Sequence, residues 1–265
     1  MSLNSKTAQG AYIKGAGVSK TYETNDGEVL ALQPIDFELQ SGQFVSLIGP
    51  SGCGKSTLML LVAGRLPLTT GAIEIDGTVL DKPLTDVGIV FQDHLLLDFR
   101  TAIENILLQT QIRGYEEEAA RQEANRLLEQ LGLAHAAQRY PNQLSGGMRQ
   151  RVSLGRALIH DPSVLLMDEP FGALDAITRT QMRHDLEKLW LAKRKTVLFI
   201  THSVEEAIGL SDRVLVMSAG PGKLIEDIQI DLERPRPVEI GEHKAFIEYA
   251  DHIYGIFREL GVLKI

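Results

Sequence analysis

Hydrophobic residues alternate with polar ones in the first part of the chain, up to about residue 90. The alternation is clear over residues 35–39 and again over 73–75, and the pair Asp76-Gly77 follows the second stretch. Alternation of this kind is typical of a strand with one buried face, and Asp-Gly is a strong hairpin signal. We therefore predict an antiparallel sheet at the start of the chain.

Further along, the pattern changes to short unbroken apolar runs separated by helical stripes. The runs are Phe44–Ile48, Val164–Met167 and Val197–Ile200. The stripes are Ala120, Ala124, Leu127, Leu128 and Leu131, and then Met182, Leu186, Leu189 and Trp190. Unbroken runs are typical of parallel strands buried on both faces, so their alternation with helices predicts a parallel sheet covered by helices.

Two regions lie outside this alternation. The stretch from Glu116 to about Gly132 is helical in pattern and lies between two of the parallel strands, which predicts a helical subdomain. Beyond residue 230, Arg234-Pro235-Arg236-Pro237 breaks regular structure. A last helix has a polar face that is not rich in Lys and Arg, so we expect it to pack against the body or a second copy rather than lie on a membrane. Its apolar stripe is Phe246, Ala250, Ile253, Phe257 and Leu260.

Composition narrows the classes of function. With 27 basic and 35 acidic residues the formal net charge is −8, which argues against broad nucleic-acid binding through a basic face. Cys53 is the only cysteine, so no intrachain disulfide exists and we expect a reducing compartment. No apolar run approaches the roughly 20 residues of a membrane span, and the polar N-terminus lacks the apolar core of a signal peptide. A role at a membrane would therefore depend on partners.

One segment after the run 44–48 matches the phosphate-loop pattern of two glycines followed by lysine and a hydroxyl residue. It consists of Gly49, Pro50, Ser51, Gly52, Cys53, Gly54, Lys55 and Ser56. The glycines let the backbone wrap closely, so that several N–H groups point at the same phosphates. Lys55 supplies a charge for the β- and γ-phosphates, and the Ser56 hydroxyl is a candidate Mg²⁺ ligand. We expect a helix to open at Thr57, with its N-terminus facing the anion.

A second element is the apolar run that ends in Asp168-Glu169. A buried strand delivers Asp168 to its carboxyl end, where an α/β sheet binds ligands and a carboxylate holds Mg²⁺ directly or through water. Glu169 is a candidate general base for a water that attacks the γ-phosphate. Such a strand end, taken alone, is more often simply solvated. Its combination with the phosphate loop favours the functional interpretation.

The third element is Leu144-Ser145-Gly146-Gly147-Met148, where Ser145 is a candidate helix cap and the glycines expose N–H groups. Here the sequence resembles the ATP-binding cassette (ABC) transporter family. In that family the segment is the signature motif, which contacts ATP held by the other cassette of a dimer. Many relatives carry Gln where Met148 stands, but Ser145, Gly146 and Gly147 are all present.

The resemblance implies roles for four further residues. Gln92 matches the glutamine that senses Mg²⁺ and links the site to the membrane partner, and Asp175 lies in the loop through which two cassettes communicate. His202 matches the switch histidine that touches the γ-phosphate, and Tyr22 matches the aromatic residue that stacks on adenine. Directly after His202, the spacing of Ser203 and Glu206 predicts a capping box.

The resemblance also implies a fold and partners. The expected fold is α/β, a P-loop NTPase-type core with a mainly parallel sheet, an N-terminal antiparallel β subdomain and a helical signature subdomain. We expect a flexible tail over residues 1–10, a cassette over 11–230 with its helical subdomain at about 93–160, and a C-terminal linker and helix over 231–265. The implied ligands are ATP and Mg²⁺. The implied partners are a second copy in an ATP-dependent homodimer, two integral membrane permease subunits and, indirectly, an extracytoplasmic substrate-binding protein, at the cytoplasmic face of the inner membrane and without nucleic acid.

Within the family, the sequence is most similar to importers of nitrate, sulfonates and taurine. The segments that carry this similarity are 149–151, 171–175, Pro221-Gly222 and 231–236. One departure concerns the region after Gln92, where relatives often have Leu-Pro-Trp and this chain has Leu96-Leu97-Asp98-Phe99. That region faces the membrane subunit in the family, so the departure bears on the partner and the substrate.

Three rival functions remain open. A soluble superfamily member in DNA repair or translation would usually carry two cassettes or a long coiled-coil insertion, and these 265 residues contain neither. A P-loop kinase for a small molecule would not need the segment 144–147, and Glu169 would be less expected. An exporter commonly has its membrane domain fused to the cassette. The sequence does not reveal the identity of the transported molecule, because this subunit does not contact it.

Overall fold

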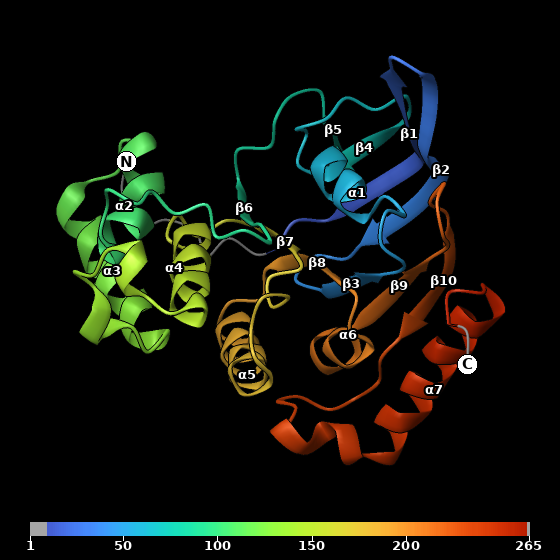
Figure 1. The fold of residues 1–265 in the computed structure, drawn as a ribbon. Helices are drawn as coiled ribbons and strands as arrows, with labels where there is room; N and C mark the ends of the chain where they lie inside the picture. The colour runs from blue at the N-terminus through green and yellow to red at the C-terminus, as the bar shows by residue number, and fades with distance from the viewer. Residues whose placement is uncertain (1–9, 264–265) are drawn as a thin grey trace.

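Two β-sheets organise the part of the chain that the structure, a computed structural model, describes: residues 10–263 (Figure 1). The first sheet is antiparallel, has the strand order β2-β1-β4-β5, and confirms the sheet predicted near the start of the chain. Its strands are β1 (Ile13–Thr24), β2 (Gly27–Leu39), β4 (Thr70–Ile75) and β5 (Thr78–Val79). The predicted tail over residues 1–10 lies outside the described residues except for Gly10.

The Asp76-Gly77 pair joins β4 to β5 as predicted. Both residues have positive φ, 49° and 76°, and Ile75 pairs with Thr78 across the turn. A two-residue turn with positive φ at both positions matches the right-handed twist of the strands that it connects.

The second sheet has six strands in the order β10-β9-β3-β8-β7-β6, of which all but β10 run parallel. They are β3 (Phe44–Ile48), β6 (Val87–Val90), β7 (Val164–Asp168), β8 (Thr196–Thr201), β9 (Arg213–Met217) and β10 (Leu224–Gln229). The three predicted runs are thus β3, β7 and β8, and they lie next to one another. Ile48 is paired with Thr201, and Asp168 with Ile200. The residues that follow these strands therefore meet at one edge of the sheet.

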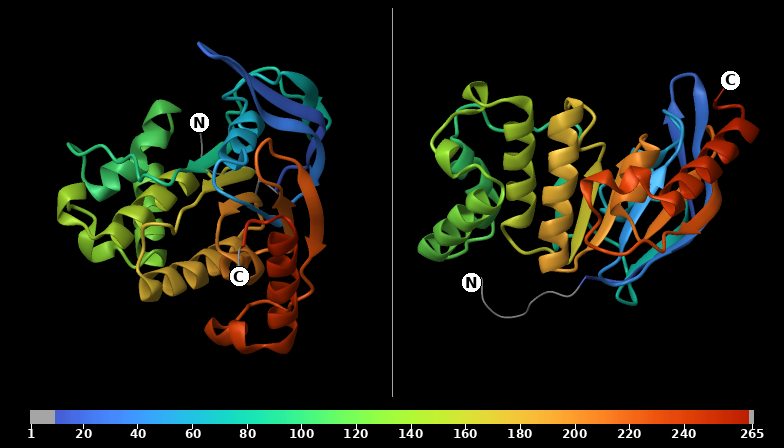
Figure 2. Two further views of the ribbon diagram at one scale, coloured as in Figure 1. Left: turned by 45° about the vertical axis from the view of Figure 1, so that its right-hand side comes forward. Right: turned by 90° about the horizontal axis from the view of Figure 1, so that it is seen from below.

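The helices form two groups. Around the sheets lie α1 (Lys55–Val62), α5 (Ala176–Ala192), α6 (Val204–Leu210) and α7 (Lys244–Glu259). A separate lobe contains α2 (Ala102–Ile112), α3 (Glu117–Gln130) and α4 (Gly146–Leu158). Short 3-10 helices lie at Ala134–Ala136, Pro141–Gln143 and Val238–Glu242. Figure 2 shows this helical lobe on the far side of the molecule from the antiparallel sheet in both views.

Three apolar clusters hold these layers together. One joins the helical lobe to α5 and one face of the six-stranded sheet, and a second fills the space around α1 between the two sheets. In the third, Phe246, Ile253 and Phe257 of α7 pack with α6 and β9, so the last helix packs on the body of its own chain. No helix within residues 10–263 is long and apolar enough to cross a membrane.

Candidate functional site

The phosphate-loop segment connects β3 to α1 at the carboxyl edge of the six-stranded sheet. Gly52 and Gly54 have φ of 75° and 97°, values that residues with a Cβ rarely adopt, so the loop needs glycine at both positions. The chain enters α1 directly after Gly54, with Lys55 as the first helical residue. The prediction that the helix opens at Thr57 is therefore wrong by two residues, because the left-handed turn at Gly54 already aims the backbone into the helix.

Lys55 is buried and its ammonium group lies inside the loop. Its Nζ donates hydrogen bonds to the carbonyls of Gly49, at 2.9 Å, and Pro50, at 2.8 Å. Cys53 is fully buried behind it, and burial raises the pKa of the Cys53 thiol. A thiol held neutral packs the loop and is a poor nucleophile. Ser51 is exposed at the tip of the loop.

Ser56 and Asp168 meet where α1 begins and β7 ends. The Ser56 hydroxyl is hydrogen-bonded to the Asp168 carboxylate. Burial raises the pKa of Asp168, against the lowering effect of that hydrogen bond. A carboxylate, a hydroxyl and the amide oxygen of Gln92 are hard oxygen donors of the kind that Mg²⁺ prefers, so the residues present fit this ion.

Glu169 is held in an unusual backbone conformation next to His202. Its φ is 44°, in the left-handed region that costs a non-glycine residue on the order of 1–3 kcal/mol. His202 Nδ1 lies 3.3 Å from Glu169 Oε2, and the histidine side chain is 58% exposed. A Cβ placed on Gly172 would lie 3.8 Å from Glu169 Oε2 and 3.9 Å from Gln92 Nε2. Glu169, His202 and Gln92 therefore converge around Gly172.

Tyr22 borders the same site from the antiparallel sheet. Its hydroxyl lies 3.2 Å from the Thr57 hydroxyl, and the Lys20 ammonium lies 5.2 Å from the centre of its ring. The half-buried ring thus stands beside the first turn of α1, close to the phosphate loop.

The signature segment is not brought to the phosphate loop of the same chain. Ser145 caps α4 by accepting a hydrogen bond from Met148 N at 3.3 Å, as its position predicts. In Figure 1, α4 belongs to the helical lobe, whereas α1 lies on the other side of β7. Ser145, Gly146 and Gly147 therefore stand apart from Lys55 and Ser56.

The signature segment contacts the loop that carries Asp175 instead. A Cβ on Gly147 would come within 2.6 Å of Thr178 Cγ2, so the two segments are in close contact. Thr178 in turn donates to Asp175, from its N at 3.0 Å and from its hydroxyl at 2.6 Å. These bonds make Asp175 the cap of α5 and lower the pKa of its carboxyl group.

The capping box predicted after His202 is only half formed. The Ser203 hydroxyl accepts from Glu206 N at 3.2 Å, but the Glu206 carboxylate does not return to Ser203. It accepts from the Thr201 hydroxyl at 2.5 Å and lies 3.6 Å from Arg179 Nε. The prediction is wrong for Glu206 because a buried hydroxyl and a guanidinium group compete for its side chain.

Sequence reasoning missed the turn that covers the phosphate loop. Gly222 exchanges backbone hydrogen bonds with Ala31 and Gln33, both of 2.9 Å, and a Cβ on Gly222 would lie 2.0 Å from the Cys53 carbonyl. Only glycine fits there. The Gly-Pro-Gly sequence around Pro221 is the signal in the sequence that indicates such a turn.

The segment after Gln92 is exposed but firmly held. Phe99 is 75% exposed and Leu95 is 57% exposed. The fully buried Asn105 accepts from Leu97 N at 2.8 Å and donates to the carbonyls of Leu97, Arg100 and Thr101. Arg156 donates to the carbonyl of Leu95 at 2.6 Å. An apolar surface is therefore presented to solvent on a fixed backbone.

Comparison with known proteins agrees with these features. The family model described as "ABC transporter" matches residues 32–172. The aliphatic sulfonates import ATP-binding protein SsuB of Bacillus thuringiensis is 43% identical over 219 residues, covering 83% of this chain and 86% of the relative. The nitrate import ATP-binding protein NrtD of Synechococcus elongatus is also 43% identical, covering 84% of this chain and 82% of the relative. The solved dimeric structure of MJ0796, a bacterial ABC transporter cassette, is similar with a TM-score of 0.74 and 32% identity, covering 83% of this chain and 100% of that one.

Proposed function

Because the chain belongs to the ABC transporter family, we propose that it is the ATP-hydrolysing subunit of an importer for a small anionic solute. The family and the resemblance to the sulfonate and nitrate group, predicted from the motifs, are confirmed by the comparisons. One observation carries the proposal: Lys55, Ser56 and Asp168 meet Glu169 and His202 at one edge of the sheet.

ATP binding draws on groups that the phosphate loop already holds. The Lys55 ammonium exchanges its bonds to Gly49 and Pro50 for bonds to the β- and γ-phosphates. The N-terminus of α1 and the N–H groups of the glycine-rich loop face the same phosphates. We expect the ring of Tyr22, which lies beside Thr57, to stack on the adenine.

Ser56, Asp168 and Gln92 would hold Mg²⁺, which neutralises charge on the β- and γ-phosphates when it is bound. Glu169 accepts a proton from the water whose oxygen attacks the γ-phosphorus. The bond from that phosphorus to the bridging oxygen breaks, leaving ADP and inorganic phosphate. His202, 3.3 Å from the Glu169 carboxylate, orients that base and contacts the γ-phosphate.

Hydrolysis uses a second copy of the chain. The phosphate loop covers only one side of the triphosphate, and water on the open side would weaken the electrostatic stabilisation. Ser145, Gly146 and Gly147 of the other copy supply N–H donors for that side, and Asp175 lies next to them through Thr178. The dimeric state of the related cassette supports this arrangement.

The exposed segment after Gln92 is the docking surface for the membrane partner. An exposed phenylalanine on a backbone fixed by Asn105 is suited to insert into a pocket of another protein. The complete importer would contain two permease subunits and an extracytoplasmic binding protein, with this chain peripheral at the cytoplasmic face of the inner membrane. The chain is equally similar to a sulfonate importer subunit and a nitrate importer subunit, which supports a small anion as the transported solute.

The test is a deletion of the gene in its own organism, followed by measurement of nitrate and sulfonate uptake. Wild-type protein should restore uptake of one of these anions, and Lys55→Ala should not. A chain that hydrolyses ATP in vitro while the deletion leaves anion uptake unchanged would instead support a soluble ATPase that is not coupled to this transport.

A further inference from the structure

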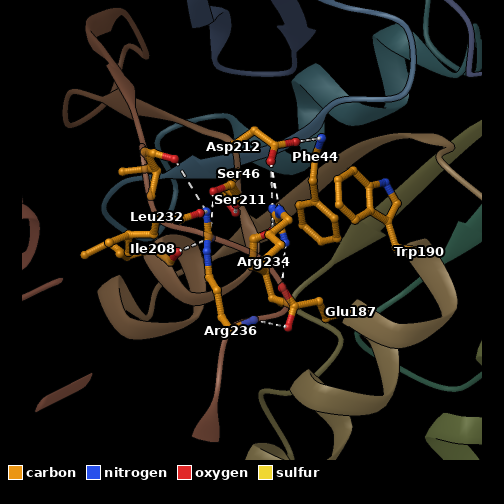
Figure 3. Close-up of polar contacts among 12 residues, drawn as sticks. Phe44, Ser46, Glu187, Trp190, Ile208, Ser211, Asp212, Leu232, Arg234 and Arg236 are labelled. Atoms are coloured by element: carbon orange, nitrogen blue, oxygen red, sulfur yellow. Dashed lines mark hydrogen bonds and ion pairs between the residues drawn. The ribbon is translucent and has the colours of Figure 1, made fainter. Parts of the chain in front are cut away.

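Two arginines in the irregular segment after β10 are buried, although arginine is mostly found on protein surfaces. Arg236 is 3% exposed, and the side chain of Arg234 is 9% exposed. Figure 3 shows their guanidinium groups close together, with Glu187 and Asp212 on either side of Arg234. Burial, aided by the charge of Arg234, lowers the pKa of Arg236 to about 10, so Arg236 is still charged at neutral pH.

Together they bind the C-terminal end of α6. Arg236 donates to the carbonyls of Ile208, at 2.6 Å, and Ser211, at 2.8 Å, while Arg234 donates to the carbonyl of Leu210 at 2.5 Å. The last carbonyls of a helix have no partners within the helix and carry its negative end. The two planar guanidinium groups therefore supply hydrogen-bond donors to three backbone carbonyls at the end of this short helix.

Arg234 also reaches α5 and β3. It donates to Glu187 Oε1 at 2.8 Å and to Asp212 Oδ1 at 3.0 Å. The second oxygen of Glu187 accepts from Arg236 N at 3.0 Å, and the second oxygen of Asp212 accepts from Phe44 N at 2.9 Å. Arg234 thus forms ion pairs with both Glu187 and Asp212, and together with Arg236 it joins one point on each of three elements.

Each of these elements carries part of the ATP site at its opposite end. β3 leads into Gly49, α5 begins after Asp175, and α6 begins just after His202. At 1.5 Å per helical residue and about 3.3 Å per strand residue, the site lies about 10 to 18 Å away along each element. We propose that Arg234 and Arg236 form a positioning clamp for the ATP site, which fixes the far ends of β3, α5 and α6. The proposal rests on the ATPase function proposed above.

The contacts at the site end explain why the clamp matters there. Arg179 on α5 lies 3.6 Å from Glu206 on α6, beyond hydrogen-bond distance, and its buried Nε has no hydrogen-bond partner. His202 is more than half exposed. One ion pair of 3.6 Å joins α5 to α6 near the site, so the shorter bonds at the far end add to the alignment of the two helices.

Arg236→Lys tests the clamp, because lysine keeps the charge but lacks the planar fork that spans two carbonyls. Since a misplacement of 1 Å costs up to about a hundredfold in rate, we expect kcat to fall about tenfold. Affinity for ATP should change less than about twofold, because Arg236 has no bond to β3 or the phosphate loop. The matched controls are Ile253→Val and Ile253→Ala on α7, which lower the melting temperature through a fully buried residue outside the clamp. They should keep the wild-type kcat at temperatures where they are folded.

A double-mutant cycle with His202→Ala separates positioning from general loosening. Single-turnover hydrolysis of bound radiolabelled ATP gives the rate of the hydrolysis step even in variants that hydrolyse ATP slowly. The loss caused by Arg236→Lys should largely disappear when His202 is absent, because α6 then positions no reacting group. Equal losses in both backgrounds, or a destabilised Arg236→Lys with wild-type kcat, would overturn the clamp. If Arg236→Lys does not fold, Glu187→Gln replaces it in the same cycle, because the amide leaves one oxygen for two donors, Arg234 Nη1 and Arg236 N. A wild-type chain that hydrolyses no ATP would refute the proposed function, and the clamp with it.

Discussion

The phosphate-loop half of the site and the signature segment are built in different ways. The first half gathers its groups from the ends of neighbouring strands and ties them together, Ser56 to Asp168 and His202 to Glu169. The signature segment stands at the start of α4 in a separate lobe and contacts the first turn of α5 through Thr178. One chain therefore holds the charged groups of a site but presents its second set of N–H donors elsewhere, which suits two copies that share two sites.

The largest effect should come from Glu169→Gln. The substitution keeps size and hydrogen bonding but removes the proton acceptor, so turnover should fall by roughly 10²–10⁴. ATP binding should remain normal, and the variant should accumulate as an ATP-bound dimer by size-exclusion chromatography. Wild-type turnover in this variant would remove Glu169 from the role of base.

The free energy of unfolding should depend on pH through His160, which follows α4 and lies 3.1 Å, through its Nε2, from the carbonyl oxygen of Val87 on β6. Burial, followed by the charge of Arg113, lowers the pKa of His160 from 6.5 to about 4. The folded protein therefore resists a proton that the unfolded chain accepts below pH 6.5. The neutral, buried His160 therefore contributes fully to the stability of the folded state above pH 6.5, and this contribution is lost as the pH falls from 6.5 to about 4.

This difference in pKa amounts to about 3 kcal/mol in the free energy of unfolding. His160→Gln should lack that part of the pH dependence in urea unfolding curves between pH 7 and 4. The exposed His135→Gln is the control and should keep it. Parallel pH profiles for the wild type and His160→Gln would contradict the assignment.

The docking surface is tested by Phe99→Asp. Loss of a central apolar anchor costs about 2 kcal/mol or more, so anion uptake should fall about thirtyfold while the ATPase activity of the isolated chain stays near wild type. Val79→Asp, at a similarly exposed valine on β5, is the matched control and should transport normally. Loss of ATP binding in Phe99→Asp would show that the segment supports the site rather than a partner.

Much of this site follows from local sequence, because its chemistry sits at strand ends. The unbroken runs of β3 and β7 place the phosphate loop and Asp168, and the motif spacing assigns their roles. The strand order could not be predicted, because pairing depends on contacts between segments far apart in the chain. Neither β9 nor β10 was recognised from its pattern.

Charged residues were the least predictable part. Glu206 has the spacing of a capping box, but its side chain bonds Thr201 instead, because the tertiary neighbours were unknown. Arg234 and Arg236 lie in a segment for which the prolines correctly predict irregular structure. Their burial depends on partners from α5, α6 and the β9 region, which no local pattern reveals.

The smallest effect concerns the contact between the signature segment and α5. Gly146 has open space where a Cβ would stand, so Gly146→Ala should stabilise the chain by about 0.5–1 kcal/mol through helix propensity. Gly147→Ala should instead destabilise it by about 1–2 kcal/mol, because the new methyl group meets Thr178. Urea midpoints at constant m-value distinguish the two, and equal shifts would contradict this packing.

The shared site is tested most directly by mixing two inactive variants, Lys55→Ala and Ser145→Arg. In a mixed dimer one composite site receives both lesions and the other is intact. Equal mixing should restore roughly a quarter of wild-type activity, because half of the dimers are mixed and each keeps one of two sites. Single-turnover hydrolysis also detects a lone intact site that cannot cycle. Full activity of Ser145→Arg alone, or no hydrolysis although mixed dimers demonstrably form, would contradict the account.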